Sequence, residues 1–232
     1  MAVLIHLETS TNVCSVALSQ DSKILWNKEN HEGQSHSVLL GKYVEELLDF
    51  VRTSEISLDG IVVSSGPGSY TGLRIGVSMA KGLAYGLDLP LLSVNTLQIM
   101  ANHVAKNFHV DDNVWLCPMI DARRMEVYTS FYDKNLHLMR DIQAEIIDKN
   151  TYSDLLKERK IVCFGNGAEK CKAILNHPNI EFIDYISPLA KDMIELGEKA
   201  FFSKEFQDVA YFEPFYLKEF VATTPKNKVI ES

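Results

Sequence analysis

The order of strands and helices expected along roughly the first hundred residues limits the fold of this chain more than any other feature of its sequence. Short apolar runs bounded by turn residues predict five strands, at residues 3–7, 13–18, 23–28, 61–64 and 91–94. Apolar residues that recur every 3.6 positions predict three helices, at residues 35–51, 73–86 and 96–106. An antiparallel opening of three strands is followed by helices that alternate with buried strands, which is typical of an α/β domain.

The second half of the chain repeats this order in part, after a polar stretch at residues 107–113. Further strands are expected at residues 115–120, 126–132, 136–147 and 161–164. Helices are expected at residues 151–159, after 165–167, and from 187 to about 202. We therefore predict two lobes, 1–108 and 109–217, followed by a flexible tail at 218–232. The order β-β-β-α-β-α-β-α is that of the RNase H-like lobes in the actin, sugar-kinase and Hsp70 (ASKHA) superfamily, an analogy of fold that does not assign a function.

Composition argues against several classes of protein. The net charge of −8 and the lack of a Lys/Arg cluster indicate that the chain does not hold RNA mainly by itself. The four cysteines form no C-x-x-C pair, so we expect buried, reduced thiols rather than a zinc site or a disulfide framework. The N-terminus lacks the features of a signal peptide, and no apolar stretch reaches the ~18 residues of a membrane span. We expect a cytosolic protein with no membrane partner.

The strongest local signal is a glycine-rich loop at residues 66–72, between a predicted strand and a predicted helix. Its glycines and the N-terminus of the helix could cradle a phosphate or a carboxylate. A tight connection that needs glycine for its backbone conformation alone explains the loop equally well. The loop is not a P-loop, because no Gly-Lys-Ser/Thr follows it. Arg74, one turn into the helix, could serve an anion or a neighbouring carboxylate.

Two other places carry polar side chains suited to binding a ligand. Glu8 and Thr9 lie in the turn between the first two strands, which meets nucleotide phosphates in the actin–kinase superfamily; a turn held by local hydroxyl hydrogen bonds is the alternative. Arg123 and Arg124 could form a bidentate phosphate or carboxylate site, or a solvated turn with an internal Asp–Arg pair. The seven histidines include no His-x-x-x-His pair, and we find no nucleophile elbow. The residues therefore predict no catalytic set and no metal site.

The first two predicted helices carry more apolar and small residues than one packed face requires. In the first helix, Leu39 and Leu48 widen the apolar stripe. The second helix contains Gly72, Gly76, Gly82 and Gly86, and a glycine costs up to ~1 kcal/mol in a helix interior. Close approach of helices from another subunit would compensate for this cost, as would deep burial inside the monomer.

Residues 66–76 read GPGSYTGLRIG and resemble the signature of the TsaB (YeaZ) family, bacterial partner subunits in threonylcarbamoyladenosine biosynthesis. Further motifs match in the same order across nearly the whole chain, at residues 8–10, 89–94, 121–128 and 213–218. The sequence departs from the family pattern at Glu8, where many members carry Asp, at Met125, where Gly is more usual, and at Lys218, where Arg is.

The resemblance implies a partner subunit rather than an enzyme. The similar catalytic subunit, TsaD, carries a His-x-x-x-His metal pair where this chain has Thr96 and Met100, which cannot replace two imidazoles. TsaB-like proteins dock on TsaD through the two helices, and TsaE, an ATPase, joins them. The assembly transfers threonylcarbamoyl to N6 of adenosine 37 in tRNAs that read ANN codons. We expect no cofactor held by this chain alone, ATP or ADP only at the partner interface, and contact with tRNA only through the complex.

On this basis the two helices supply the expected partner contacts, at His36, Leu40, Val44, Leu47, Leu73, Arg74, Val77 and Ala80. The expected contacts with a nucleotide or other anion are Glu8, Thr9, Ser69, Tyr70, Thr71, Gly72, Arg123 and Arg124. Two alternatives stay open. The fold and Glu8 would suit an autonomous ASKHA-type ATP-dependent phosphotransferase or a metallopeptidase-like enzyme, and the same helices could form a two-fold homodimer when the partner is absent.

Overall fold

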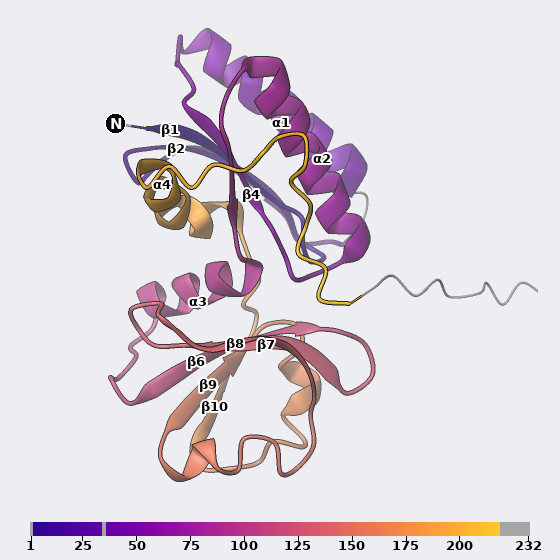
Figure 1. Ribbon diagram of the computed structural model, residues 1–232, viewed down its shortest axis with the longest axis vertical. Helices are drawn as coiled ribbons and strands as arrows, with labels where there is room; N and C mark the ends of the chain where they lie inside the picture. The colour runs from indigo at the N-terminus through magenta and orange to yellow at the C-terminus, as the bar shows by residue number, and fades with distance from the viewer. Residues whose placement is uncertain (1, 34–35, 219–232) are drawn as a thin grey trace, which may run out of the picture.

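The computed structural model describes residues 2–33 and 36–218, which form two lobes, each built on a five-stranded sheet (Figure 1). The strands of the first sheet are β1 (Val3–Glu8), β2 (Cys14–Gln20), β3 (Lys23–Asn30), β4 (Gly60–Ser64) and β5 (Leu91–Val94). Their order is β3-β2-β1-β4-β5. The three strands of the opening are antiparallel, whereas β4 and β5 run parallel to β1, as alternation with helices requires.

The second sheet repeats this topology. Its strands are β6 (Val114–Asp121), β7 (Glu126–Tyr132), β8 (Leu138–Ile146), β9 (Lys160–Phe164) and β10 (Ile180–Ile183), in the order β10-β9-β6-β7-β8. Counted from the first strand of each lobe, this order is the same as in the first sheet, with the same parallel and antiparallel pairs. The predicted α/β class with two RNase H-like lobes is confirmed.

Two long helices pack on one face of the first sheet. Helix α1 (His36–Thr53) contacts β2, helix α2 (Tyr70–Leu87) contacts β4, and the two helices contact each other. Their apolar stripes form one core cluster with β1, β2 and β4. Helix α2 begins earlier than residue 73 because Ser69 caps it: its hydroxyl accepts the Gly72 N–H at 3.3 Å.

The opposite face of the first sheet is covered by the end of the chain, which we had assigned to the second lobe. The 3-10 helix η3 (Ala190–Met193) contacts β1 and β2, and α4 (Ile194–Phe202) contacts β1 and β5 (Figure 1). The Glu198 carboxylate accepts both the N–H and the hydroxyl of Ser22, each at 2.5 Å. The following segment, residues 205–218, crosses the same lobe, where the Phe215 N–H donates to Ser65 O at 2.7 Å. A sheet with helices on one face only would leave apolar side chains in water, so the returning chain completes the core.

Helix α3 (Thr96–Asn107) lies between the lobes. We had placed it in the first lobe, but Leu97, Met100 and Val104 pack in the core of the second sheet. Ile99 points the other way, into the cluster beneath the first sheet. Because both sides of α3 are apolar, it joins the two cores.

Short pieces replace the helices predicted within the second lobe. The segment 151–159 contains only the 3-10 helix η1 (Leu155–Lys157), and the segment after 167 only η2 (Glu169–Cys171). The Asp148 carboxylate holds a tight turn by accepting the Asn150 and Thr151 N–H groups, and Tyr152 follows with a φ of +69°. The predicted helix at 187–202 begins as η3, where the Ala190 N–H donates to the Ser15 hydroxyl at 2.8 Å. Strand β10 was not predicted.

The four cysteines are buried and free, as predicted. Within the described part of the chain, every helix is too short or too polar for a membrane span. The tail predicted to be flexible, apart from Lys218, lies outside the described residues.

Candidate functional site

The glycine-rich loop packs directly against the turn between β1 and β2. The Ser69 N–H donates to Ser10 O at 2.6 Å, and the Thr9 hydroxyl donates to Gly72 O at 2.7 Å. A Cβ added at Gly68 would lie 2.3 Å from Ser10 O, and one added at Gly72 would lie 2.1 Å from Thr9 O. Close backbone packing therefore explains these glycines, and the polypeptide itself fills the space at the N-terminus of α2.

The polar residues of the β1–β2 turn are buried beneath this loop. Glu8 is 0% exposed and Thr9 is 1% exposed. Burial raises the pKa of the Glu8 carboxyl, although the Ser10 N–H donates to Oε1 at 2.5 Å, and Oε2 has no hydrogen-bond partner. A raised pKa favours the neutral acid, which is a poor partner for a metal-bound water. Contrary to the prediction, the chain itself covers Glu8, Thr9 and Gly72, and no nucleotide can reach them in this conformation.

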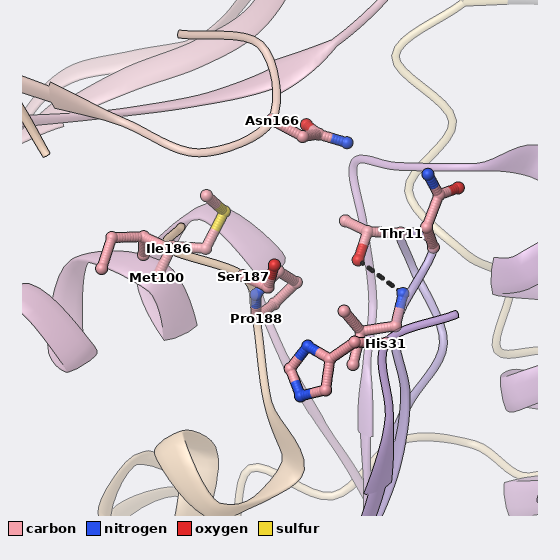
Figure 2. A pocket seen from close by; sticks show the side chains of 9 residues that line it. Thr11, His31, Met100, Asn166, Ile186, Ser187 and Pro188 are labelled. Atoms are coloured by element: carbon pink, nitrogen blue, oxygen red, sulfur yellow. Dashed lines mark hydrogen bonds between the residues drawn. The ribbon is translucent and has the colours of Figure 1, made fainter. Parts of the chain in front are cut away.

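A small cavity lies between the lobes (Figure 2). It is lined by Thr11, Asn12, Val13, His31, Met100, Asn166, Ile186, Ser187 and Pro188. Asn166 projects from a loop of the second lobe toward the turn that carries Thr11 (Figure 2). The volume of about 150 Å³ falls short of the ~300–1,000 Å³ usual for ligand pockets, so it cannot enclose a nucleotide. None of the residues predicted to bind a ligand lines it.

Six of the eight predicted partner contacts lie in this chain's own core. They are 0–5% exposed: Leu40, Val44, Leu47, Leu73, Val77 and Ala80. For these six residues the alternative, burial within the monomer, holds, and Leu39 and Leu48, which widen the stripe, are partly buried against the same core. His36 is half-buried, and its Nε2 lies 2.6 Å from Thr11 O, which ties the start of α1 to the β1–β2 turn. Arg74 is exposed, with its guanidinium over the Tyr70 ring at 5.0 Å from the centroid.

The outward faces of α1 and α2 are open. A Cβ added at Gly41, Gly82 or Gly86 would meet nothing within 4 Å. Two large apolar side chains flank these glycines, Val38 at 67% exposure and Tyr85 at 84%. Nothing in the described part of the chain uses the space above these glycines, so their helix-propensity cost has no compensation inside the monomer.

The segment 213–218 joins the other two predicted regions, a role that we missed although its motif is visible in the sequence. The Tyr216 ring stacks on Tyr70 at a centroid distance of 4.8 Å. Lys218 forms an ion pair with Glu126, at the start of β7. Arg123 and Arg124 are exposed in the turn just before that strand. Residues 216–218 therefore connect the N-terminal end of α2 to the start of β7, next to the turn that carries the arginine pair.

Among residues 2–33 and 36–218, no three His, Cys, Asp or Glu side chains gather closely enough to hold a metal ion. Thr96 and Met100 are 0% and 1% exposed, in the packing between α3 and its neighbours.

Comparison with known proteins places the chain in a family. A family model described as TsaD, tRNA N6-adenosine threonylcarbamoyltransferase, matches residues 28–227. The tRNA threonylcarbamoyladenosine biosynthesis protein TsaB of Bacillus subtilis is 31% identical over 220 residues, which cover 93% of each chain. The chain belongs to the TsaB (YeaZ) family. The Escherichia coli TsaB is 28% identical over 94% of this chain and 96% of its own. The structure of YeaZ from Pseudomonas aeruginosa, 23% identical, has the same fold, with a TM-score of 0.76 over 94% of this chain and 100% of that chain.

The chain also matches part of a longer protein that is named as a transferase. A tRNA N6-adenosine threonylcarbamoyltransferase from Clostridium perfringens is 32% identical to this chain over 101 residues, 44% of this chain and 29% of that enzyme. The match covers less than a third of that enzyme's own length, so it does not carry the enzyme's activity to this chain.

Proposed function

We propose that this chain is a non-catalytic subunit in the formation of N6-threonylcarbamoyladenosine at position 37 of tRNAs that read ANN codons. In this proposal the chain binds and stabilises a TsaD-like catalytic subunit. The names of the TsaB relatives from Bacillus subtilis and Escherichia coli, both threonylcarbamoyladenosine biosynthesis proteins, support the pathway. The observation that carries the non-catalytic role is the burial of Thr96 and Met100 in apolar packing, because neither side chain can hold a catalytic metal there.

The outward face of α1 and α2 is the proposed docking surface. Gly41, Gly82 and Gly86 leave room for a partner helix to approach closely. Val38 and Tyr85 add exposed apolar area beside them, and burying that area would favour association. The buried residues that we first expected at the interface act instead by holding the two helices on the sheet.

A single glycine substitution tests this surface. Gly82→Leu adds a side chain where the isolated chain has open space, so the monomer should fold as before, but a close partner helix would clash with it. We expect the variant to lose co-elution with a TsaD-like subunit and to lose the modification activity of the reconstituted assembly. The matched control is Ser153→Leu, at an exposed position in the second lobe. Normal assembly with Gly82→Leu would refute the docking face, and full tRNA modification without this chain would refute the function.

The remaining parts of the assembly are expectations that rest on the family resemblance. A TsaE-like ATPase would join the pair, and ATP or ADP would bind only at the partner interface. In the first lobe the exposed Ser69, Thr71 and Arg74 and the half-buried Tyr70 remain accessible to such a nucleotide. In the absence of the partner, the same helical face would form a homodimer, which light scattering over a dilution series would detect. We expect the assembly to work in the cytoplasm, where it meets tRNA.

An autonomous phosphotransferase is the less favoured function. It would need an open nucleotide cleft and an ionised carboxylate, whereas the cavity between the lobes is about 150 Å³ and Glu8 is buried with a raised pKa. Calorimetric titration of the isolated chain with ATP and Mg²⁺ distinguishes the two functions, because tight binding would favour the enzyme.

A further inference from the structure

Two of the six arginines of this chain form neither an ion pair nor a ring contact with the residues that the structure describes. The other four are engaged: Arg52 pairs with Asp49, Arg140 pairs with Glu145, Arg74 lies over Tyr70 and Arg159 lies over Trp115. Arg123 and Arg124 are exposed, and within residues 2–33 and 36–218 neither guanidinium has an ion pair or a ring contact. They stand side by side in the turn between β6 and β7.

The carboxylates beside this turn are already taken. Lys170 forms an ion pair with Asp121 and donates a second hydrogen bond to Glu126 O at 2.7 Å. Lys218 forms an ion pair with the Glu126 carboxylate. Four cations and two carboxylates therefore share this corner, in a chain whose net charge is −8. The excess positive charge comes from Arg123 and Arg124.

The backbone holds both arginines in an unfavourable conformation. Arg123 has a φ of +69° and Arg124 a φ of +50°. A left-handed conformation costs a residue with a Cβ about 1 kcal/mol or more, and Gly or Asn is the usual choice in such a turn. The turn is kept in place by the Arg123 N–H, which donates to Asp121 Oδ1 at 3.0 Å, and by the Glu126 N–H, which donates to Arg123 O at 3.1 Å. Gly or Asn would form this turn at lower cost, so the backbone conformation does not explain the two arginines. Their exposed guanidinium groups are the feature that Gly or Asn would lack.

The arginine pair lies near the N-terminal end of α2, one of the two helices that carry the proposed docking surface. Lys218 at the turn is two residues from Tyr216, which stacks on Tyr70 at the first residue of α2. An RNA that is held by the partner subunit and passes this end of α2 would meet the turn. Guanidinium groups bind phosphate oxygens with two parallel hydrogen bonds, and such contacts position RNA without reading its sequence.

We propose that Arg123 and Arg124 bind backbone phosphates of the tRNA held by the assembly. The inference rests on the proposed function and goes beyond it, because we had expected tRNA to be bound only through the other subunits. The pair adds affinity without specificity, which suits a subunit that assists an enzyme acting on several tRNAs.

Charge reversal in the assembled complex tests this inference. The variant is Arg123→Glu/Arg124→Glu, and its matched control is Lys149→Glu/Lys160→Glu, the same charge change at exposed positions elsewhere in the second lobe. Fluorescence anisotropy with a labelled tRNA that reads an ANN codon should show about tenfold or greater loss of affinity for the first variant only. The salt slope of log K should fall by roughly 1.4 to 1.8, because each of the two phosphate contacts contributes about 0.7 to 0.9.

Three results with the Arg123→Glu/Arg124→Glu variant would overturn the proposal. The first is a tRNA affinity and a salt slope equal to those of the control variant. The second is a loss of co-elution with the partner, which would assign the arginines to a protein contact, and the third is a loss of ATP binding while tRNA binding is unchanged. If the wild-type chain itself fails to assemble, the proposed function fails first. Assembly of the wild-type chain together with tRNA binding that ignores the charge reversal refutes this inference alone.

Cross-linking gives a second readout that does not depend on charge. All four native thiols are buried, so a thiol-reactive photo-cross-linker should label only a cysteine introduced at the surface. Arg124→Cys in the complex should cross-link to tRNA, and Lys160→Cys should not. Equal yields at the two positions, or none at 124, would contradict the proposal.

Discussion

The contact between the β1–β2 turn and the glycine-rich loop can be tested with one substitution made at two places in the same helix. Gly72→Ala places a Cβ 2.1 Å from Thr9 O, a backbone atom that cannot rotate away. Gly82→Ala places the same methyl group in open space. The two variants differ in whether the surrounding native structure leaves room for the added methyl group. They also differ in their place along the helix, because Gly72 lies in the first turn of α2 and Gly82 lies in its interior.

The expected magnitudes follow from this difference. At Gly82 the change should stabilise the chain by up to about 1 kcal/mol, through helix propensity. At Gly72 the overlap requires the backbone to shift, which costs about 1 to 3 kcal/mol, and the shift weakens the hydrogen bond from the Thr9 hydroxyl to Gly72 O, worth about 1 kcal/mol. The net loss should be about 2 to 4 kcal/mol. For a chain of 232 residues this lowers Tm by roughly 4 to 16 °C.

Urea denaturation followed by circular dichroism measures the free energy of unfolding of both variants and of the parent chain. Equal stability of Gly72→Ala and Gly82→Ala would refute the packing argument. It would also reopen the interpretation of the loop as an anion cradle, because space at the N-terminus of α2 would then be available to a ligand.

Two further substitutions examine polar groups that the fold buries. Burial lowers the pKa of His6 to about 3, so the folded chain keeps this imidazole neutral, while the unfolded chain takes up a proton below about pH 6.5. The free energy of unfolding must therefore decrease as the pH falls from about 6.5 toward 3, with a loss of about 2 kcal/mol at pH 5. His6→Gln, whose amide can keep the contact with the Ser19 hydroxyl, should remove this loss in urea titrations at pH 7 and pH 5, and an unchanged pH dependence would contradict the assignment. Glu198→Ala removes the acceptor for both Ser22 groups, so it should destabilise the first lobe by about 2 to 4 kcal/mol, whereas Glu195→Ala, at an exposed position of the same helix, should change stability little. A small effect at Glu198 would show that α4 is not anchored to the first sheet through this contact.

The elements of the first lobe were predictable because each one has a local signal. Leu40, Val44 and Leu47 recur at helical spacing, and β4 is a short run of apolar residues between turns. Asn95 is a typical N-cap residue, and its side chain accepts the N–H groups of Leu97 and Gln98 at the start of α3.

The second lobe was harder to predict because its connections are short. Residues 151–159 have helical composition, but the turn built by Asp148 and the left-handed Tyr152 leave room for only one turn of 3-10 helix. Strand β10 has only four residues and none is fully buried, so its apolar signal is weak. At the other end of the chain, η3 starts where Ala190 bonds to Ser15, a partner 175 residues away.

The candidate site shows the same division between local and tertiary information. Sequence motifs mark the segments 66–76, 121–128 and 213–218, which the structure brings together, but they do not show which of their side chains face water. Apolar residues on α1 and α2 have the same spacing whether they face the sheet or a partner, and burial decides for the sheet at Val44 and Val77. The open space above Gly82 became visible only once the neighbours of α2 were known.

The sequence by itself determined the α/β class, the division into two related lobes and the family, because periodicity, turn residues and short motifs are local properties of the chain. Only the tertiary structure decided that the chain returns to the first sheet after residue 189, that Glu8 is buried beneath the glycine-rich loop, and that Arg123 and Arg124 form no ion pair within residues 2–33 and 36–218. Each of these outcomes depends on contacts between residues far apart in sequence, and such contacts leave no periodic signal along the chain.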